Sequence, residues 1–179
     1  MAVTCVRYEV DGWGIGELWT DGGRVVWHEL PRPAATGSAG PGSPWGEAST
    51  PRTTLATKSA PVRADFVSKL VTRLEEYFAG GNDAFADVPL DLGGLTPFER
   101  ACAAALRRVR RGTTVTYAEL AERAGSPRAA RAAGSFCARN RFAVFIPCHR
   151  VVSASGLGGY GLLGLEYKRR LLALENVAV

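Results

Sequence analysis

The sequence predicts an α+β fold in which a small antiparallel-sheet domain, residues 1–92, precedes a mainly helical domain, residues 93–179. Three observations lead to this prediction. The first thirty residues roughly alternate apolar and polar side chains between turn pairs, whereas the second half begins its helices with two capping boxes. The charge also divides between the two parts: the first carries 8 Lys and Arg against 12 Asp and Glu, and the second carries 14 against 5.

Three strands are expected in the first thirty residues. Thr4–Val10 is followed by the turn pair Asp11-Gly12, after which Gly14–Thr20 can run back along it. A second turn, Asp21–Gly23, precedes Arg24–Leu30. Tight turns join antiparallel neighbours, so the three strands are expected to form one small sheet.

A long loop and a helix follow the predicted sheet. Six of the ten prolines fall between Pro31 and Pro61 among Gly, Ser, Thr and Ala, which predicts a loop over residues 31–61 that contributes nothing to a core. The segment from Val88 to Gly94 is expected to connect the two domains. Between them, apolar residues at helical spacing predict a helix that ends at Gly80-Gly81. These residues are Phe66, Val67, Leu70, Val71, Leu74, Tyr77 and Phe78.

Three helices are predicted at the start of the second half. Thr96–Glu99 is a capping box with Pro at the first helical position, and its helix is expected to reach about Val109. Thr116–Glu119 is a second capping box, with a helix that stops at Gly125. A third helix is expected over Ser126–Ala138, capped by its Ser-Pro pair. Two short helices joined by a tight turn form a helix-turn-helix candidate, although many helix pairs in protein cores look the same.

The predicted third helix carries arginines among small residues. Arg128 and Arg131 are three positions apart and can share a face. Small residues let a helix backbone approach another surface closely, and neighbouring arginines can then reach phosphates or a groove. Close packing on another helix would require the same small residues, and the sequence leaves both interpretations open. The small residues are Ala129, Ala130, Ala132, Ala133, Gly134 and Ser135.

Composition narrows the class of protein. A chain of 179 residues with 46% apolar side chains is long enough for a core and is not disordered, collagen-like or a coiled coil. No apolar run approaches the roughly 20 residues that span a bilayer, and no signal peptide is recognisable, so a cytoplasmic location without a membrane partner is expected. The four cysteines are expected to be free thiols. The basic second half predicts a polyanionic partner, most commonly nucleic acid, although a merely solvated surface would have the same charge.

One short segment holds the candidate reactive group. The apolar run Phe142–Ile146 is expected to form a strand that delivers Cys148 next to His149. A thiolate is the reactive form of cysteine, and an imidazole that accepts the thiol proton raises its fraction. Neighbouring residues of a strand point to opposite faces, so the imidazole needs a turn or a bridging water to reach the sulfur. A third group must orient the imidazole, and Glu166 and Glu175 are the candidates.

Five blocks of the second half carry a family resemblance. They are Pro147–Val151, the Gly156–Gly161 loop, Lys168–Glu175, Tyr117–Ala121 and Ala129–Ala132. Together they resemble the O6-alkylguanine-DNA alkyltransferases, the family also called methylated-DNA–protein-cysteine methyltransferases. The resemblance covers most of the second half and extends to the first half only in outline. It implies a winged-helix-like second domain with a helix-turn-helix, and a duplex DNA partner that contains O6-alkylguanine.

The resemblance implies direct reversal of DNA damage without a cofactor. Cys148 would attack the alkyl carbon on guanine O6, and on thymine O4, and keep the group as a thioether, so each molecule would act once. The thiol would be activated through a water by His149, backed by Glu175. Asn140 would hold the backbone of the turn that leads to the reactive segment, and Tyr117 would protonate guanine N3 as the base leaves.

The same resemblance assigns residues to DNA and to the base. Arg131 would enter the duplex and replace the extruded nucleotide. The other expected DNA contacts are Arg128, Ala129, Ser135, Arg139 and Arg150. The base pocket is expected to be lined by Tyr160, Gly159, Gly161, Val151 and Lys168. Arg141 stands where relatives usually have Pro, and the sequence leaves open whether Arg139 and Arg141 touch phosphates or are plain surface charges.

Other chemistries are weighed against this one. Cys5 and His28 are the only plausible metal ligands before Cys102, two short of a closed site, so no metal is expected. The Gly156–Gly161 run lacks the preceding strand and the later acidic residue of a dinucleotide loop. Two further alternatives are a sensor that binds alkylated guanine without transfer and a Cys–His hydrolase. A monomer is expected, while cooperative binding along DNA and the preference for methyl or bulky adducts stay open.

Overall fold

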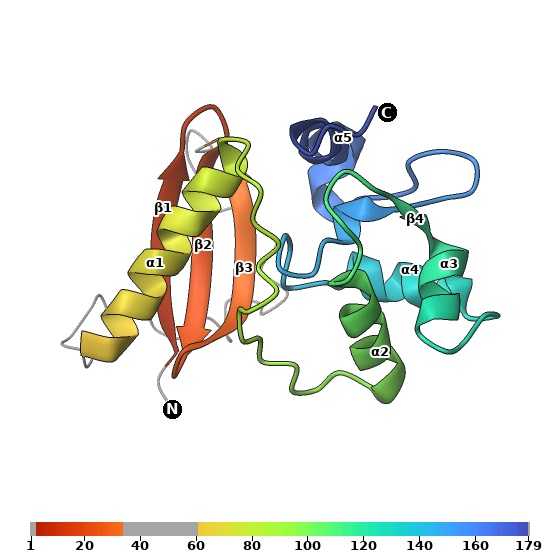
Figure 1. Cartoon of the computed structure of the whole chain (residues 1–179), viewed down its shortest axis with the longest axis horizontal. Coiled ribbons are helices and arrows are strands. Elements are labelled where there is room, and N and C mark those ends of the chain that lie inside the picture. Colours follow the sequence, from red (N-terminus) through yellow and green to blue (C-terminus); the bar gives the residue numbers. More distant parts are fainter. Residues whose placement is uncertain (1–2, 34–60, 179) are drawn as a thin grey trace. The chain divides into compact units, whose positions relative to one another are not determined.

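The computed structural model describes residues 3–33 and 61–178, which form two compact units, residues 1–79 and 80–179 (Figure 1). Most of the loop expected over residues 31–61 therefore lies outside the described residues. Its described ends belong to regular structure, because Pro31 is in a strand and Pro61 begins a helix. Among the described helices, none is long and apolar enough to cross a bilayer.

The first unit is a three-stranded antiparallel sheet with one helix. Strands β1 (Thr4–Val10), β2 (Gly14–Asp21) and β3 (Arg24–Arg32) are hydrogen-bonded in that order, which confirms the three predicted strands. Helix α1 (Pro61–Phe78) packs on β1 and begins five residues before the first periodic apolar residue. Its apolar stripe fills the core together with the sheet. The buried helix residues are Leu70, Leu74, Tyr77 and Phe78.

The division between the units falls earlier than the boundary expected at residues 92 and 93. Residues 80–92 pack onto the second unit, in which the Phe85 ring meets the Phe145 ring edge-to-face at 5.2 Å between centroids. The Arg107 guanidinium donates to the carbonyls of Phe85, Ala86 and Val88, each at 2.9 Å. The segment expected to be a connector thus belongs to the second unit.

Two capping boxes begin the first helices of the second unit. The α-helices of this unit are α2 (Pro97–Leu106), α3 (Tyr117–Arg123), α4 (Ala130–Ala138) and α5 (Gly164–Leu174), and the capping boxes belong to α2 and α3. The Thr96 and Thr116 hydroxyl oxygens accept hydrogen bonds from the backbone N–H groups of Glu99 and Glu119, the third residues of α2 and α3. The carboxylates of these two glutamates in turn accept the backbone N–H of each threonine. Both predicted capping boxes are confirmed, although α2 ends at residue 106 rather than near 109.

Helix α4 begins at Ala130, four residues later than the Ser-Pro pair predicts. The backbone carbonyl of Ser126 accepts a hydrogen bond from the Ala129 N–H at 2.9 Å, and this three-residue spacing closes a turn rather than the first turn of an α-helix. Arg128 consequently lies in the turn between α3 and α4. The expectation that Arg128 shares a helix face with Arg131 is therefore wrong.

The apolar run Phe142–Ile146 is a buried turn, so the expectation of a strand there is wrong. The Ile146 N–H donates to the Phe142 carbonyl at 2.7 Å, and Val144 has a φ of 73°. An apolar run that is buried on all sides does not reveal by its composition whether it is extended or turned. A short 3₁₀ turn, η1 (Cys148–Arg150), follows, and β5 (Val151–Val152) then pairs in parallel with β4 (Val115–Thr116).

Candidate active site

The Cys148 thiol lies at the start of η1 and is 7% exposed. Its backbone N–H donates to the Ile146 carbonyl at 2.7 Å, so the cysteine is held against the end of the preceding turn. Burial raises the pKa of the Cys148 thiol, while hydrogen bonding by Asn140 and Tyr160 and the charge of Lys168 act in the opposite direction. The resting thiol is therefore protonated at neutral pH and needs a base to become reactive.

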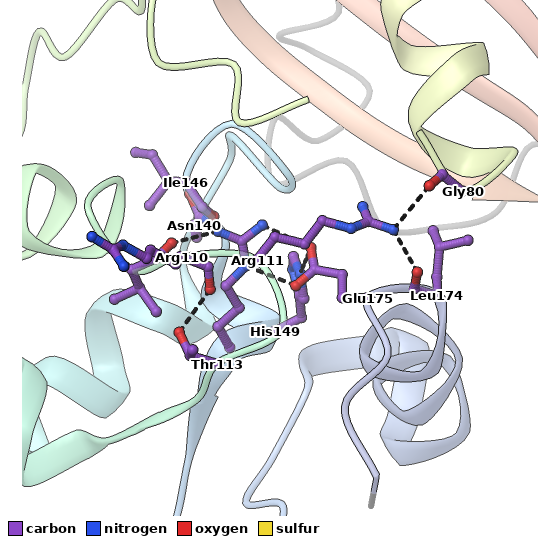
Figure 2. Close-up of polar contacts among 11 residues, drawn as sticks. Gly80, Arg110, Arg111, Thr113, Asn140, Ile146, His149, Leu174 and Glu175 are labelled. Carbon is purple, nitrogen blue, oxygen red and sulfur yellow. Dashed lines mark hydrogen bonds and ion pairs between the residues drawn. The ribbon is translucent and has the colours of Figure 1, made fainter. Parts of the chain in front are cut away.

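Asn140 closes the turn that leads to this thiol. Its side-chain amide donates to the Ile146 carbonyl at 2.7 Å (Figure 2). Its side-chain carbonyl oxygen accepts the Phe142 N–H at 3.0 Å. One side chain thus bonds a buried backbone group near each end of the turn and ties the two ends together. The position of Cys148 depends on this arrangement because its N–H bonds the same Ile146 carbonyl.

His149 and Glu175 form a buried pair next to the thiol. The imidazole Nε2 lies 3.0 Å from Glu175 Oε1, and both side chains are fully buried (Figure 2). Burial lowers the pKa of His149 although Glu175 opposes this, so the imidazole is neutral at pH 7. Of the two acids considered for orienting His149, Glu175 is the one in contact, whereas Glu166 is exposed and pairs with Arg169.

The Glu175 carboxylate stays ionised despite its burial. Burial by itself would raise its pKa, but hydrogen bonds from His149 and Arg150 and the charges of both hold the pKa well below its ordinary range. An ionised acceptor next to Nε2 requires that Nε2 carry the imidazole proton. The lone pair of the neutral ring is then on Nδ1, which is the nitrogen that must accept a proton from the thiol side.

Arg150 is not the DNA contact that was expected. Each of its guanidinium nitrogens donates to a protein acceptor: Nε and Nη2 bind the two Glu175 oxygens at 2.8 and 2.7 Å, and Nη1 binds the Val109 carbonyl at 2.6 Å. The residue is only 4% exposed, so it does not present a charge to a phosphate. Its two parallel bonds to one carboxylate instead hold Glu175 in place.

Arg111 holds the end of α5 next to Glu175, and this role was not predicted from the sequence. Its Nη2 donates to the carbonyls of Leu174 and Gly80, the second at 3.4 Å (Figure 2). Leu174 is the last residue of α5, and Glu175 caps that helix. In the sequence, the four arginines between residues 107 and 111 contribute only to the basic charge of the second half. Two of its members, Arg107 and Arg111, bind backbone carbonyls inside the second unit.

Lys168 was expected to line the base pocket, but its fully buried ammonium is used on the backbone. It donates to the carbonyls of Val151 at 2.6 Å, Leu157 at 2.5 Å and Gly159 at 3.4 Å. Val151, also expected at the pocket, is fully buried and contributes its carbonyl to this group. Lys168 therefore fixes the loop before Tyr160 and favours the thiolate of Cys148 through its charge.

Tyr117 lies between that loop and α4. A Cβ atom added to Gly158 would be 2.9 Å from the Tyr117 hydroxyl, and one added to Gly134 would be 3.7 Å from its ring. Burial raises the pKa of Tyr117, so the phenol keeps its proton and can act as a donor. Tyr160 stacks on Tyr167 with ring centroids 6.4 Å apart.

The remaining expected contact residues lie on the surface of the second unit. Arg131 and Ser135 are exposed on α4, Arg128 is exposed in the preceding turn, and Ala129 is half-buried. Gly159 and Gly161 are exposed in the loop around Tyr160, and Gly161 has a φ of 48°. Arg139 is exposed but pairs with Glu99 at 2.9 Å. The part of the chain that the structure describes contains no group of three or more His, Cys, Asp or Glu that could hold a metal.

Comparison with known proteins places these features in a family. Residues 97–177 match the family described as 6-O-methylguanine DNA methyltransferase, DNA binding domain. A methylated-DNA–protein-cysteine methyltransferase of Mycolicibacterium paratuberculosis is 48% identical over 107 residues, which are 59% of this chain and 63% of that protein. This match thus spans slightly less than two thirds of the relative's own length.

Solved structures extend the similarity to nearly the whole chain. A variant of the Mycobacterium tuberculosis O6-methylguanine methyltransferase superposes with a TM-score of 0.70 and 32% identity, covering 97% of this chain and 92% of that one. Mycobacterium tuberculosis OGT in complex with DNA gives a TM-score of 0.68 and 31% identity, covering 98% and 93%. The fold is that of O6-methylguanine methyltransferases, and residues 97–177 are matched by the DNA-binding domain of that family. The chain belongs to the methylated-DNA–protein-cysteine methyltransferase family, the O6-alkylguanine-DNA alkyltransferases.

Proposed function

We propose that the protein repairs DNA by direct reversal, moving the alkyl group of O6-alkylguanine, and of O4-alkylthymine, from duplex DNA onto Cys148. One observation carries the proposal: the buried thiol shares a 3₁₀ turn with His149, whose Nε2 binds the buried Glu175 carboxylate at 3.0 Å. A neutral imidazole held by an ionised carboxylate can take a proton and remain stabilised as imidazolium.

The reaction is a single displacement. The bond between the Cys148 sulfur and the alkyl carbon forms while the bond between that carbon and O6 breaks. The thiol proton passes through a water to His149, and the departing guanine takes a proton on N3 from Tyr117. His149 then releases a proton to solvent and Tyr117 takes one up, so that overall one proton moves from the thiol to the base. The product is a thioether, which water does not hydrolyse, so each molecule acts once.

DNA recognition is assigned to α3 and α4 as a helix-turn-helix in a winged-helix-like unit. The excess of basic residues in this unit, and the solved complex of the Mycobacterium tuberculosis relative with DNA, support that assignment. Arg131 enters the duplex where the damaged nucleotide is extruded, at a cost of a few kcal/mol for unstacking. Arg128, Ala129 and Ser135 contact the backbone and groove beside it. The extruded base lies against Tyr160, Gly159 and Gly161.

We also place the protein in the cytoplasm as a monomer. All four cysteines are unpaired, which fits a reducing compartment. A monomer is sufficient for the reaction, because the thiol, its base and the orienting carboxylate come from one unit of one chain.

The test is to mix the protein with a duplex that contains O6-methylguanine and to measure the intact protein mass and the repaired base. We expect one methyl group per molecule, located on Cys148, and no turnover beyond one equivalent. Cys148→Ser should keep duplex affinity and lose transfer. Cys137→Ser is the matched control, because the Cys137 thiol has its pKa raised by burial and is given no role in transfer.

Other outcomes identify the alternatives. Unmodified protein that still binds the lesion would indicate a sensor, and repeated turnover would indicate a hydrolytic or other catalytic activity. Arg131→Ala should weaken duplex binding and slow repair of duplex DNA more than reaction with the free alkylated base. An equal loss in both assays would contradict the role given to Arg131.

A further inference from the structure

Arg141 follows the turn-closing Asn140 and contacts a segment fifty positions earlier in the chain. Its Nη2 donates to the Asp91 carbonyl at 2.8 Å and to the Gly93 carbonyl at 3.1 Å. These acceptors are themselves ordered, because the Asp91 carboxylate accepts the Gly93 N–H at 3.0 Å. The guanidinium carbon also lies 5.0 Å from the centre of the buried Phe142 ring, a cation–π distance.

A short series of contacts connects this guanidinium to the reactive sulfur. Arg141 and Phe142 are the first residues of the turn, and Asn140 bonds Phe142 and Ile146 across it. The Ile146 carbonyl then accepts the N–H of Cys148 at 2.7 Å. Residues 91–93 of the second unit therefore help to hold the turn from which the nucleophile emerges.

Arg139, on the other side of Asn140, makes a second but weaker attachment. It pairs with Glu99 at 2.9 Å, and its side chain is 67% exposed. An exposed pair of this kind contributes little, because water and salt compete for both partners. The two arginines that flank Asn140 thus differ: Arg139 can exchange Glu99 for a phosphate, whereas Arg141 is bound to backbone carbonyls.

We propose that Arg141 is a positioning residue for alkyl transfer: by holding the Asn140–Ile146 turn against Asp91 and Gly93, it aligns the Cys148 sulfur with the alkyl carbon. This inference rests on the proposed function. Substitution at the alkyl carbon requires the sulfur, the carbon and the leaving oxygen to be in line. If the reacting group is misplaced by about 1 Å, the rate of such a reaction falls by up to about 100-fold. Arg141 does not touch DNA in this proposal.

The experiment measures single-turnover transfer from an O6-methylguanine duplex over a range of protein concentrations. Arg141→Ala should lower the rate constant at saturation about tenfold and leave the duplex Kd unchanged. The amount of protein finally alkylated should stay at one equivalent, because misaligned protein reacts slowly, whereas misfolded protein would not react at all. Arg108→Ala is the matched control: it removes an exposed arginine of the same unit that has no side-chain partner among the described residues, and its rate constant should equal that of the wild type.

Two further measurements separate positioning from DNA binding. Reaction with free O6-methylguanine should fall by the same factor as reaction with the duplex, and the salt dependence of duplex binding should be unchanged in Arg141→Ala. A phosphate contact would instead reduce the slope of log affinity against log salt by about 0.9 and spare the free base. Arg141→Lys, which keeps a donor able to reach the carbonyls, should recover part of the lost rate.

The outcomes that overturn the proposal are distinct from those that overturn the proposed function. An unchanged rate constant, a loss confined to duplex Kd, or a lower alkylated fraction at a normal rate each exclude a positioning role for Arg141. If the wild-type protein accepts no alkyl group from either substrate, the proposed function is wrong and Arg141 has no reaction to position.

Discussion

Replacing Arg150 by Met tests the finding that this arginine is internal. Arg150→Met keeps much of the apolar volume but removes three hydrogen bonds, two to Glu175 and one to the Val109 carbonyl. Glu175 is then left as a buried carboxylate whose described partner is His149. Breaking a buried ion pair from one side costs about 3–5 kcal/mol, because the other charge stays buried without compensation.

That magnitude is large relative to the roughly 5–15 kcal/mol that stabilises a typical domain. We therefore expect urea unfolding of the second unit to shift to much lower denaturant in Arg150→Met. Residues 80–179 contain no tryptophan, so tryptophan fluorescence does not report directly on the second unit. The second unit must be followed by amide hydrogen exchange of α5 and the residues around Cys148, with tryptophan fluorescence as the control for the unit that was not changed.

A double variant makes the test sharper. Arg150→Met combined with Glu175→Leu removes both charges, so it should be more stable than Arg150→Met alone, since a buried pair can be replaced by apolar residues of similar size. Two results would refute the reasoning: a loss below about 1 kcal/mol in Arg150→Met, which is typical of an exposed pair, or a weaker salt dependence of duplex binding, which would return Arg150 to the DNA surface.

The lowered pKa values of two buried groups, and the space for a side chain at one glycine, give three more expected outcomes. The folded pKa of Glu175 lies below its ordinary value of 4.5, so its contribution to unfolding free energy is complete above that pH and decreases as the pH falls below it; Glu175→Gln should lose this part of the acid dependence in urea titrations. Burial lowers the His149 pKa from 6.5, so the single-turnover rate constant should be level at pH 6.5 and above and should fall only as the pH drops through the lowered pKa. A rate that keeps rising in alkali would mean that solvent deprotonates the thiol. Gly158 has a φ of 69° and no space beside Tyr117, so Gly158→Ala should destabilise the second unit by about 2 kcal/mol, while Gly159→Ala, with open space, should be near neutral in the same unfolding assay.

Features that depend on a few neighbouring residues were predicted well from the sequence. The capping boxes at Thr96 and Thr116 each use a threonine and a glutamate three positions apart, so the information is local. The strand pairs joined by glycine-containing turns were also predicted from residues that are close together in the chain. Cys148 and His149 were also found from their adjacency. The residues alone left Glu166 and Glu175 open for orienting the imidazole, and the family resemblance selected Glu175, which is the acid in contact.

Features that depend on distant partners were predicted poorly. Arg150 has the charge and the chain position of a DNA contact, and only the approach of Glu175, 25 positions later, makes it internal. Lys168 was assigned to the pocket, although its partners are backbone carbonyls, which have no sequence signature. The apolar run after Asn140 was interpreted as a strand because hydrophobicity indicates that a segment is buried but not whether its backbone is extended or turned. The Asn140 side chain closes this turn by hydrogen bonds, which leave no periodic pattern in the sequence.

The arginine contacts around the site have a consequence for how the protein folds. Arg150, Arg111 and Arg141 bond partners that are 41, 63 and 50 positions away, so the chain must close long loops before these contacts exist. The capping boxes need only three residues and can form early. The reactive centre is thus expected to be the last part of the second unit to assemble. In refolding from urea, recovery of alkyl acceptance should lag behind the helical circular dichroism signal.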